Sequence, residues 1–138
     1  MDDLEAACHA VFHGASLYSC SQSVFFASAE GRALGTSRAI CAMISSVTGV
    51  AEQVVGKPSL IGLGCAAKRL GTAPQALAVV GDDPELEMTM AHRADALAIA
   101  VTTGVHPADR YPALPPEQTP HLTLDGVGEL LGLLPTTV

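Results

Sequence analysis

Basic residues are scarce in this sequence. Its 138 residues include 7 lysines and arginines against 14 aspartates and glutamates, which gives a formal net charge of -7. A chain with this charge repels a phosphate backbone and offers no basic stripe, so we expect no nucleic-acid partner. Hydrophobic residues make up 49% of the chain and charged residues only 15%, a composition that excludes a disordered tail and predicts a folded protein.

Long hydrophobic runs are also missing. No apolar segment reaches the roughly 18 to 20 residues that a membrane-spanning helix needs. The sequence opens with Met1-Asp2-Asp3 rather than with the basic and apolar regions of a secretory signal. We therefore expect a soluble, cytoplasmic protein with no membrane partner.

The cysteine pattern contains no C-x-x-C pair. The four cysteines are widely spaced among apolar neighbours, as is typical of reduced thiols in a cytosol: Cys8, Cys20, Cys41 and Cys65. His9 and His13 have the spacing of a zinc-binding pair, but no third ligand follows at a suitable distance, so we do not expect a metal site there. No G-x-S-x-G motif is present, which argues against a serine hydrolase.

The first 50 residues contain two helical patterns. Apolar spacing predicts a helix over 3–13 that ends at Gly14, and a second over 37–48 that follows an N-cap at Thr36 or Ser37 and ends before Gly49. Between them, residues 15–27 are typical of one or two short strands, and residues 29–32 of a turn.

After residue 50 the sequence alternates between short apolar strands and helices. Strands are expected over 52–55, 76–80, 96–101 and 122–124. Helices are expected from Pro58 to Leu70, from Pro84 to Arg93 and after an N-cap at Asp125, and the proline-rich residues 104–120 are expected to form a loop. This alternation predicts an α/β fold with a parallel sheet, and the change of pattern places a domain boundary between residues 1–50 and 51–138.

Two of these strands are followed by polar residues. Lys57 follows the first strand and precedes a helix N-terminus, where a cation and free backbone N–H groups attract an anion such as phosphate. Asp82 and Asp83 follow the strand over 76–80, where neighbouring carboxylates favour a hard cation such as Mg2+. Each motif alone is also an ordinary turn or helix cap, but their order and spacing favour one site at the carboxyl edge of a parallel sheet.

The same segments resemble the second half of haloacid dehalogenase (HAD) superfamily phosphatases. The subfamily that they resemble most contains para-nitrophenylphosphatases and phosphoglycolate-phosphatase-like enzymes. The matching segments are Val55-Gly56-Lys57-Pro58-Ser59, Lys68-Arg69-Leu70-Gly71, Ala78-Val79-Val80-Gly81-Asp82-Asp83, Ala91-His92-Arg93-Ala94 and Ala98-Ile99-Ala100-Val101-Thr102-Thr103-Gly104. The resemblance implies a partial Rossmann-like (HAD) parallel sheet with flanking helices over 51–138, preceded by part of an α/β cap domain over 1–50.

This resemblance also implies a function. It indicates a Mg2+-dependent phosphatase that acts on a small phosphorylated metabolite, a phosphate monoester. Lys57 would be the catalytic lysine that neutralises charge on the nucleophile and the phosphoryl group. Asp82 would be the main metal ligand and Asp83 a second candidate, with Glu85 or Glu87 as a further acid near the metal.

The chain departs from this family pattern in several places. The superfamily's D-x-D nucleophile motif does not occur in these 138 residues, and neither does its second-motif serine or threonine. A Thr-Asn-x-Asp segment of the relatives would fall on Cys20, Ser21 and Ser23. We therefore expect the carboxy-terminal part of such an enzyme, or alternatively a noncatalytic α/β module with a relict phosphate and metal site. A truncated sheet exposes a strand edge and apolar surface, so self-association through a sheet edge or the cap surface is expected.

Overall fold

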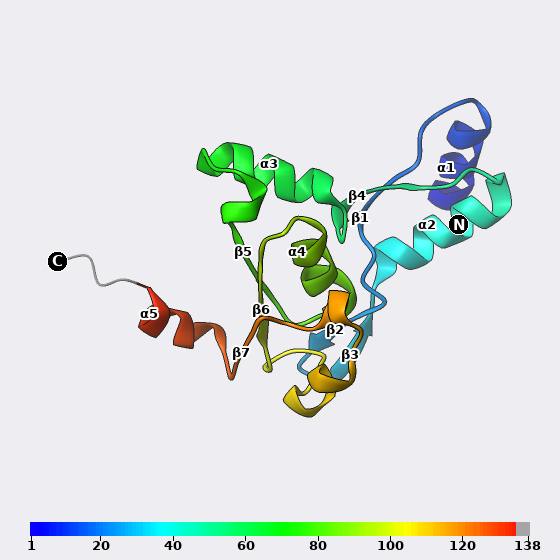
Figure 1. The fold of residues 1–138 in the computed structure, drawn as a ribbon. Coiled ribbons are helices and arrows are strands. Elements are labelled where there is room, and N and C mark those ends of the chain that lie inside the picture. The colour runs from blue at the N-terminus through cyan, green and yellow to red at the C-terminus, as the bar shows by residue number, and fades with distance from the viewer. Residues whose placement is uncertain (135–138) are drawn as a thin grey trace. The chain divides into compact units, whose positions relative to one another are not determined.

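The computed structural model describes residues 1–134, which divide into two compact units (Figure 1). The first unit comprises Met1–Gly62, and the second begins at Leu63. The division falls inside helix α3 (Leu60–Leu70). The domain boundary between residues 1–50 and 51–138, which the change of sequence pattern predicts, stays a prediction.

Two helices form the core of the first unit. Helix α1 (Asp2–Phe12) packs against α2 (Thr36–Thr48), as their apolar periodicity predicts. Gly49 ends α2 in the left-handed conformation, with φ of 72°. The predicted N-cap is wrong, because α2 begins after Gly35 without a side-chain cap. The core residues of this unit are Cys8, Val11 and Ile44, with Ala7, Leu17 and Met43 packed against them.

The first unit contains two short two-stranded sheets. Strand β1 (Tyr18–Ser21) runs parallel to β4 (Gln53–Lys57), and the pairing ends with Ser21 opposite Lys57. Strand β2 (Phe25–Ser28) forms an antiparallel hairpin with β3 (Gly31–Leu34). Strands β1, β2 and β4 were predicted, whereas β3 was not, since Gly31 and Arg32 were assigned to a turn.

A parallel sheet forms the centre of the second unit. Its three strands, in the order β5-β6-β7, are β5 (Ala78–Gly81), β6 (Leu97–Val101) and β7 (Leu122–Leu124). Helix α3 precedes β5, helix α4 (Thr89–Arg93) lies between β5 and β6, and helix α5 (Leu130–Leu133) follows β7. The predicted α/β class with a parallel sheet and flanking helices is therefore confirmed. The core contains Leu63, Val79, Met88, Met90, Ala91, Ala94, Ala96, Ala98, Ala100 and Tyr111.

The second unit differs from the prediction in its helix starts. The segment from Pro84 begins with a wide π-helical turn over Pro84–Met88 and becomes α-helical only in α4. Asp125 does not cap the last helix, which is preceded instead by a 3-10 turn over Val127–Glu129. The loop over 104–120 contains 3-10 turns over Ala108–Ala113 and Pro116–Gln118. Among residues 1–134, no helix has the length and apolar character that crossing a membrane requires.

Candidate functional site

Asp82 follows the carboxyl end of β5 and is held by the loop that follows β6. Its carboxylate Oδ2 accepts a hydrogen bond from the backbone N–H of Val105 at 2.8 Å. The hydroxyl of Tyr111 donates to the backbone carbonyl of Asp82 at 3.4 Å. Since β5 and β6 are parallel, both contacts lie at the sheet edge where ligands bind in open α/β folds.

Two glycines make room for the acidic side chains at this edge. A Cβ atom on Gly104 would overlap the carboxylate of Asp82, and a Cβ on Gly81 would overlap the side chain of Glu87. Neither position tolerates a side chain without a shift of its neighbour. Glycine at position 104 therefore allows the loop to lie directly against the Asp82 carboxylate.

Asp83 caps the helical segment that starts at Pro84. Its Oδ1 accepts a hydrogen bond from the Glu85 backbone N–H at 3.0 Å, and its own N–H donates to Glu87 Oε2 at 3.1 Å. Burial raises the pKa of the Asp83 carboxyl, the Glu85 hydrogen bond opposes this, and the charges of Glu87, Glu85 and Asp82 raise the pKa further. This edge of the sheet thus concentrates negative charge, which a bound cation would offset.

Tyr111, which donates to the Asp82 carbonyl, is a buried residue at the acidic edge. Its side chain is only 3% exposed. Burial raises the pKa of Tyr111 to about 12, and the charges of Asp82, Asp83 and Glu87 add to this effect. The phenol is therefore protonated at neutral pH and acts as a hydrogen-bond donor.

The carboxylate oxygens at this edge fit a magnesium ion whose remaining ligands are water and substrate oxygens. The hydrogen bond from Val105 engages Oδ2 of the Asp82 carboxylate, which leaves Oδ1 for a hard cation. Within residues 1–134, no group of three or more His, Cys, Asp or Glu side chains could hold a metal. One or two carboxylates with water and substrate oxygens are the usual magnesium ligands at phosphate-processing sites, so the arrangement is compatible with this type of site.

Lys57 lies at the other candidate position, in the first unit. It is the last residue of β4, its side chain is exposed, and a cis peptide bond joins it to Pro58. The backbone carbonyl of Lys57 accepts a hydrogen bond from the Gln22 N–H at 3.3 Å. Asp82 and Asp83 belong to the second unit, so the meeting of Lys57 with these carboxylates stays a prediction.

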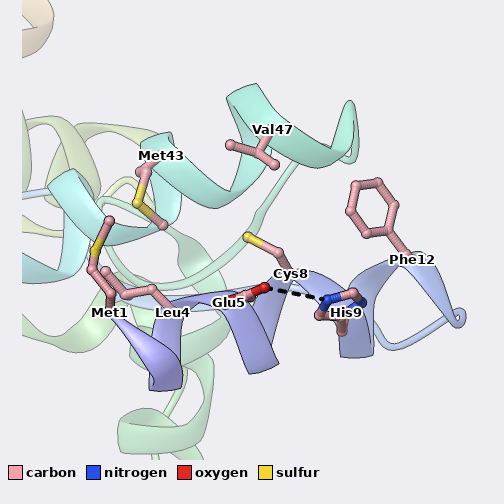
Figure 2. A pocket seen from close by; sticks show the side chains of 8 residues that line it. All are labelled: Met1, Leu4, Glu5, Cys8, His9, Phe12, Met43 and Val47. Atoms are coloured by element: carbon pink, nitrogen blue, oxygen red, sulfur yellow. Dashed lines mark ion pairs between the residues drawn. The ribbon is translucent and has the colours of Figure 1, made fainter.

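A pocket in the first unit involves none of these residues. It lies between α1 and α2 and has a volume of about 340 Å³ (Figure 2). Its lining is mostly apolar: Met1, Leu4, Glu5, Cys8, His9, Phe12, Met43 and Val47. Figure 2 shows the Glu5–His9 ion pair, with an Oε1–Nε2 distance of 3.9 Å, on the α1 side of this pocket. His9 and His13 are not part of a metal cluster in this part of the chain.

Comparison with known proteins identifies a family model and several similar structures. The HAD-hydrolase-like family model matches residues 54–130. The sequence is 31% identical to a thermostable NPPase double mutant from Geobacillus stearothermophilus, with a TM-score of 0.76, over 90% of this chain and 47% of that one. No curated protein sequence matches the chain.

Two further structures share the fold. The glycerol phosphate phosphatase of Mycobacterium tuberculosis, solved in complex with magnesium, is 25% identical, with a TM-score of 0.81, over 94% of this chain and 39% of that one. The 4-nitrophenylphosphatase of Thermotoga maritima is 22% identical, with a TM-score of 0.82, over 95% of this chain and 49% of that one. The chain thus spans about half the length of these structures or less.

Proposed function

This chain belongs to the HAD-hydrolase-like family, and on that premise we propose that it is the carboxy-terminal part of a Mg2+-dependent phosphatase. Its substrate would be a small phosphate monoester, a phosphorylated metabolite of the cytoplasm. The observation that carries the proposal is the environment of Asp82, where a backbone N–H holds one carboxylate oxygen at the sheet edge and Gly104 provides the space. Phosphatases are also the named activities of several similar structures.

Asp82 and Lys57 would each have a separate electrostatic role in the reaction. Phosphoryl transfer depends mainly on positioning and on neutralising the charge of the transferring oxygens. The Lys57 ammonium group would attract the phosphoryl oxygens and the nucleophile. Asp82 would hold Mg2+ through the oxygen that Val105 does not engage, with Asp83 as the second candidate ligand. When bound, Mg2+ would supply positive charge that stabilises the phosphoryl oxygens.

The nucleophile would come from sequence outside these 138 residues, since no D-x-D motif occurs in them. Without an activated nucleophile, Lys57 and Asp82 bind phosphate and metal but do not turn over substrate by a covalent route. This absence also supports the second candidate function, a noncatalytic module that binds phosphate and metal. Both candidates require the same two residues for binding, and they differ in turnover.

A binding and turnover experiment tests the proposal. Mg2+ and inorganic phosphate are titrated into the 138-residue chain by calorimetry, and hydrolysis of p-nitrophenyl phosphate is measured with Mg2+ present. We expect Lys57→Ala to abolish phosphate binding and Asp82→Asn to abolish Mg2+ binding, whereas the exposed control variants Lys68→Ala and Asp109→Asn bind normally.

Turnover by the wild type that is lost in both variants supports the phosphatase. Binding without turnover supports the noncatalytic module, and addition of a separate polypeptide that carries a D-x-D strand then tests whether activity can be restored. If Lys57→Ala and Asp82→Asn bind phosphate and Mg2+ as the wild type does, the proposed site is wrong.

A further inference from the structure

Gln22 connects three elements of the first unit beside Lys57. Its backbone N–H donates to the Lys57 carbonyl at 3.3 Å, one residue beyond the Ser21–Lys57 pair. Its backbone carbonyl accepts a hydrogen bond from Arg38 Nη1, on α2, at 3.1 Å. Gln22 therefore joins the end of β1 to the end of β4 and to the first turn of α2.

The Gln22 side chain is itself fixed by two acceptors. Its Nε2 donates to Ser19 Oγ at 2.9 Å and to Glu52 Oε1 at 3.0 Å. A carboxylate only accepts hydrogen bonds, so the contact with Glu52 determines which end of the Gln22 amide is the nitrogen. Ser19 is only 2% exposed, and these hydrogen bonds lie in a partly buried region where they restrict the Gln22 side chain to one orientation.

Glu52 is an unusual residue for this location. Its Oε2 atom is buried, and a partly buried charge costs free energy that an apolar side chain of similar size would not. Burial acts to raise the pKa of Glu52, but the Ser19 hydroxyl, the Gln22 amide, the Cys41 thiol and the charge of Arg38 lower it below its ordinary value. The chain thus maintains a carboxylate that is hydrogen-bonded to the Gln22 side chain, and the backbone N–H of the same residue donates to the Lys57 carbonyl.

We propose that Gln22, oriented by Glu52, is a positioning residue that fixes the end of β4 so that Lys57 presents its ammonium group to a phosphoryl group. The inference rests on the phosphate-binding role proposed above for Lys57. Gln22 acts through the backbone of Lys57 and does not itself touch the phosphate. A residue that fixes the direction of a cation in this way affects the affinity for phosphate more than the affinity for Mg2+, whose candidate ligands lie in the other unit.

A donor and acceptor swap tests the inference in the 138-residue chain. Gln22→Glu places a second carboxylate opposite Glu52. The double variant Gln22→Glu/Glu52→Gln restores an amide–carboxylate hydrogen bond in which the amide is now at position 52 and the carboxylate at position 22. We expect Gln22→Glu to weaken inorganic phosphate binding about tenfold, a typical size for coupled network residues, and the double variant to recover most of this loss. Gln118→Glu and Glu117→Gln, alone and combined, are the matched controls.

Three measurements on each variant separate positioning from general damage. Calorimetry gives the dissociation constants of phosphate and of Mg2+, thermal unfolding gives Tm, and hydrogen exchange reports the Gln22 N–H that donates to Lys57. Weaker phosphate binding and faster exchange in Gln22→Glu, both restored by the swap while Mg2+ binding is constant, support the inference.

The remaining outcomes overturn it in distinguishable ways. If Lys57→Ala loses phosphate binding but Gln22→Glu binds as the wild type does, the positioning role is wrong and the proposed function stands. If Gln22→Glu lowers Tm and phosphate binding and the swap restores neither, the role of Gln22 is purely structural. If Lys57→Ala itself binds phosphate normally, the proposed function fails and the inference fails with it.

Discussion

The contact between Gly104 and Asp82 illustrates how a residue without a side chain can determine the geometry of a site. We expect Gly104→Ala to displace the Asp82 carboxylate, because the new Cβ overlaps it. Overpacking of this kind destabilises a protein by about 1–3 kcal/mol. Loss of the Val105 hydrogen bond is expected to weaken Mg2+ binding by about 10- to 100-fold.

Calorimetric titration with Mg2+ and thermal unfolding check this prediction. Gly64→Ala is the matched control, since a Cβ on Gly64, inside α3, meets nothing within 4 Å. Alanine is the better helix former, so this control is expected to retain or gain stability. If Gly104→Ala loses stability but binds Mg2+ as tightly as the wild type, Asp82 is not the metal ligand.

The cysteines give a second prediction at the residue scale. Cys20 and Cys65 are exposed, whereas Cys8 and Cys41 are buried. Burial raises the pKa of the Cys41 thiol above its ordinary value, and the neighbouring Glu52 and Cys20 raise it further. Because the thiolate is the reactive form and a raised pKa confines it to higher pH, Cys41 is expected to resist alkylation even in mildly alkaline buffer.

Iodoacetamide labelling followed by peptide mass spectrometry tests this expectation. Cys20 and Cys65 are expected to react in the native protein, and all four cysteines after denaturation. Labelling of Cys41 as fast as Cys65 in the native state would contradict the described burial.

At the scale of elements, Asp83 has a structural role that competes with metal binding. Its Oδ1 caps the segment from Pro84, and this cap is the ordinary interpretation that the sequence also allowed. Asp83→Ala is expected to cost about 1 kcal/mol of unfolding free energy, whereas Asp83→Ser retains an N-cap oxygen and most of the stability.

Chemical denaturation of both variants, with Mg2+ titration of Asp83→Ser, separates the two roles. Unchanged Mg2+ affinity in Asp83→Ser identifies Asp83 as a helix cap only. A large loss of affinity at unchanged stability would instead make Asp83 a second ligand.

The elements that were predicted from sequence are those whose signals are local. Apolar periodicity and a following glycine identify α1 and α2, and uninterrupted apolar runs identify β5 and β6. Strand β3 was not predicted, because it is held by pairing with β2 rather than by its own composition.

The missed parts of the candidate site have a similar cause. Asp82 and Lys57 are recognisable by residue type, but the Val105 N–H that holds Asp82 is a backbone group, which no sequence motif reveals. The Gln22–Glu52 hydrogen bond joins residues 30 positions apart, and it emerges only when β1 pairs with β4.

At the scale of the whole molecule, the chain has a net negative charge but also exposes many large apolar side chains. The β2–β3 hairpin is the clearest case, since it pairs with no other strand in residues 1–134. Its adjacent Phe25 and Phe26 are 41% and 51% exposed, on opposite faces of the strand. A two-stranded hairpin with unpaired edges and aromatic residues on both faces is a typical surface for association.

We therefore expect the chain to self-associate through this hairpin, in agreement with the prediction from the truncated sheet. Sedimentation velocity over a range of protein concentrations measures the association. Phe25→Lys and Phe26→Lys are expected to shift the protein toward the monomer, because they place charge on each face and increase repulsion at the edge. The control Leu70→Lys replaces a side chain that is 70% exposed on α3 and is expected to leave association unchanged. A wild-type protein that sediments as a stable monomer at all concentrations would refute the prediction. If all three variants reduce association equally, general surface hydrophobicity drives the association and the hairpin has no specific role.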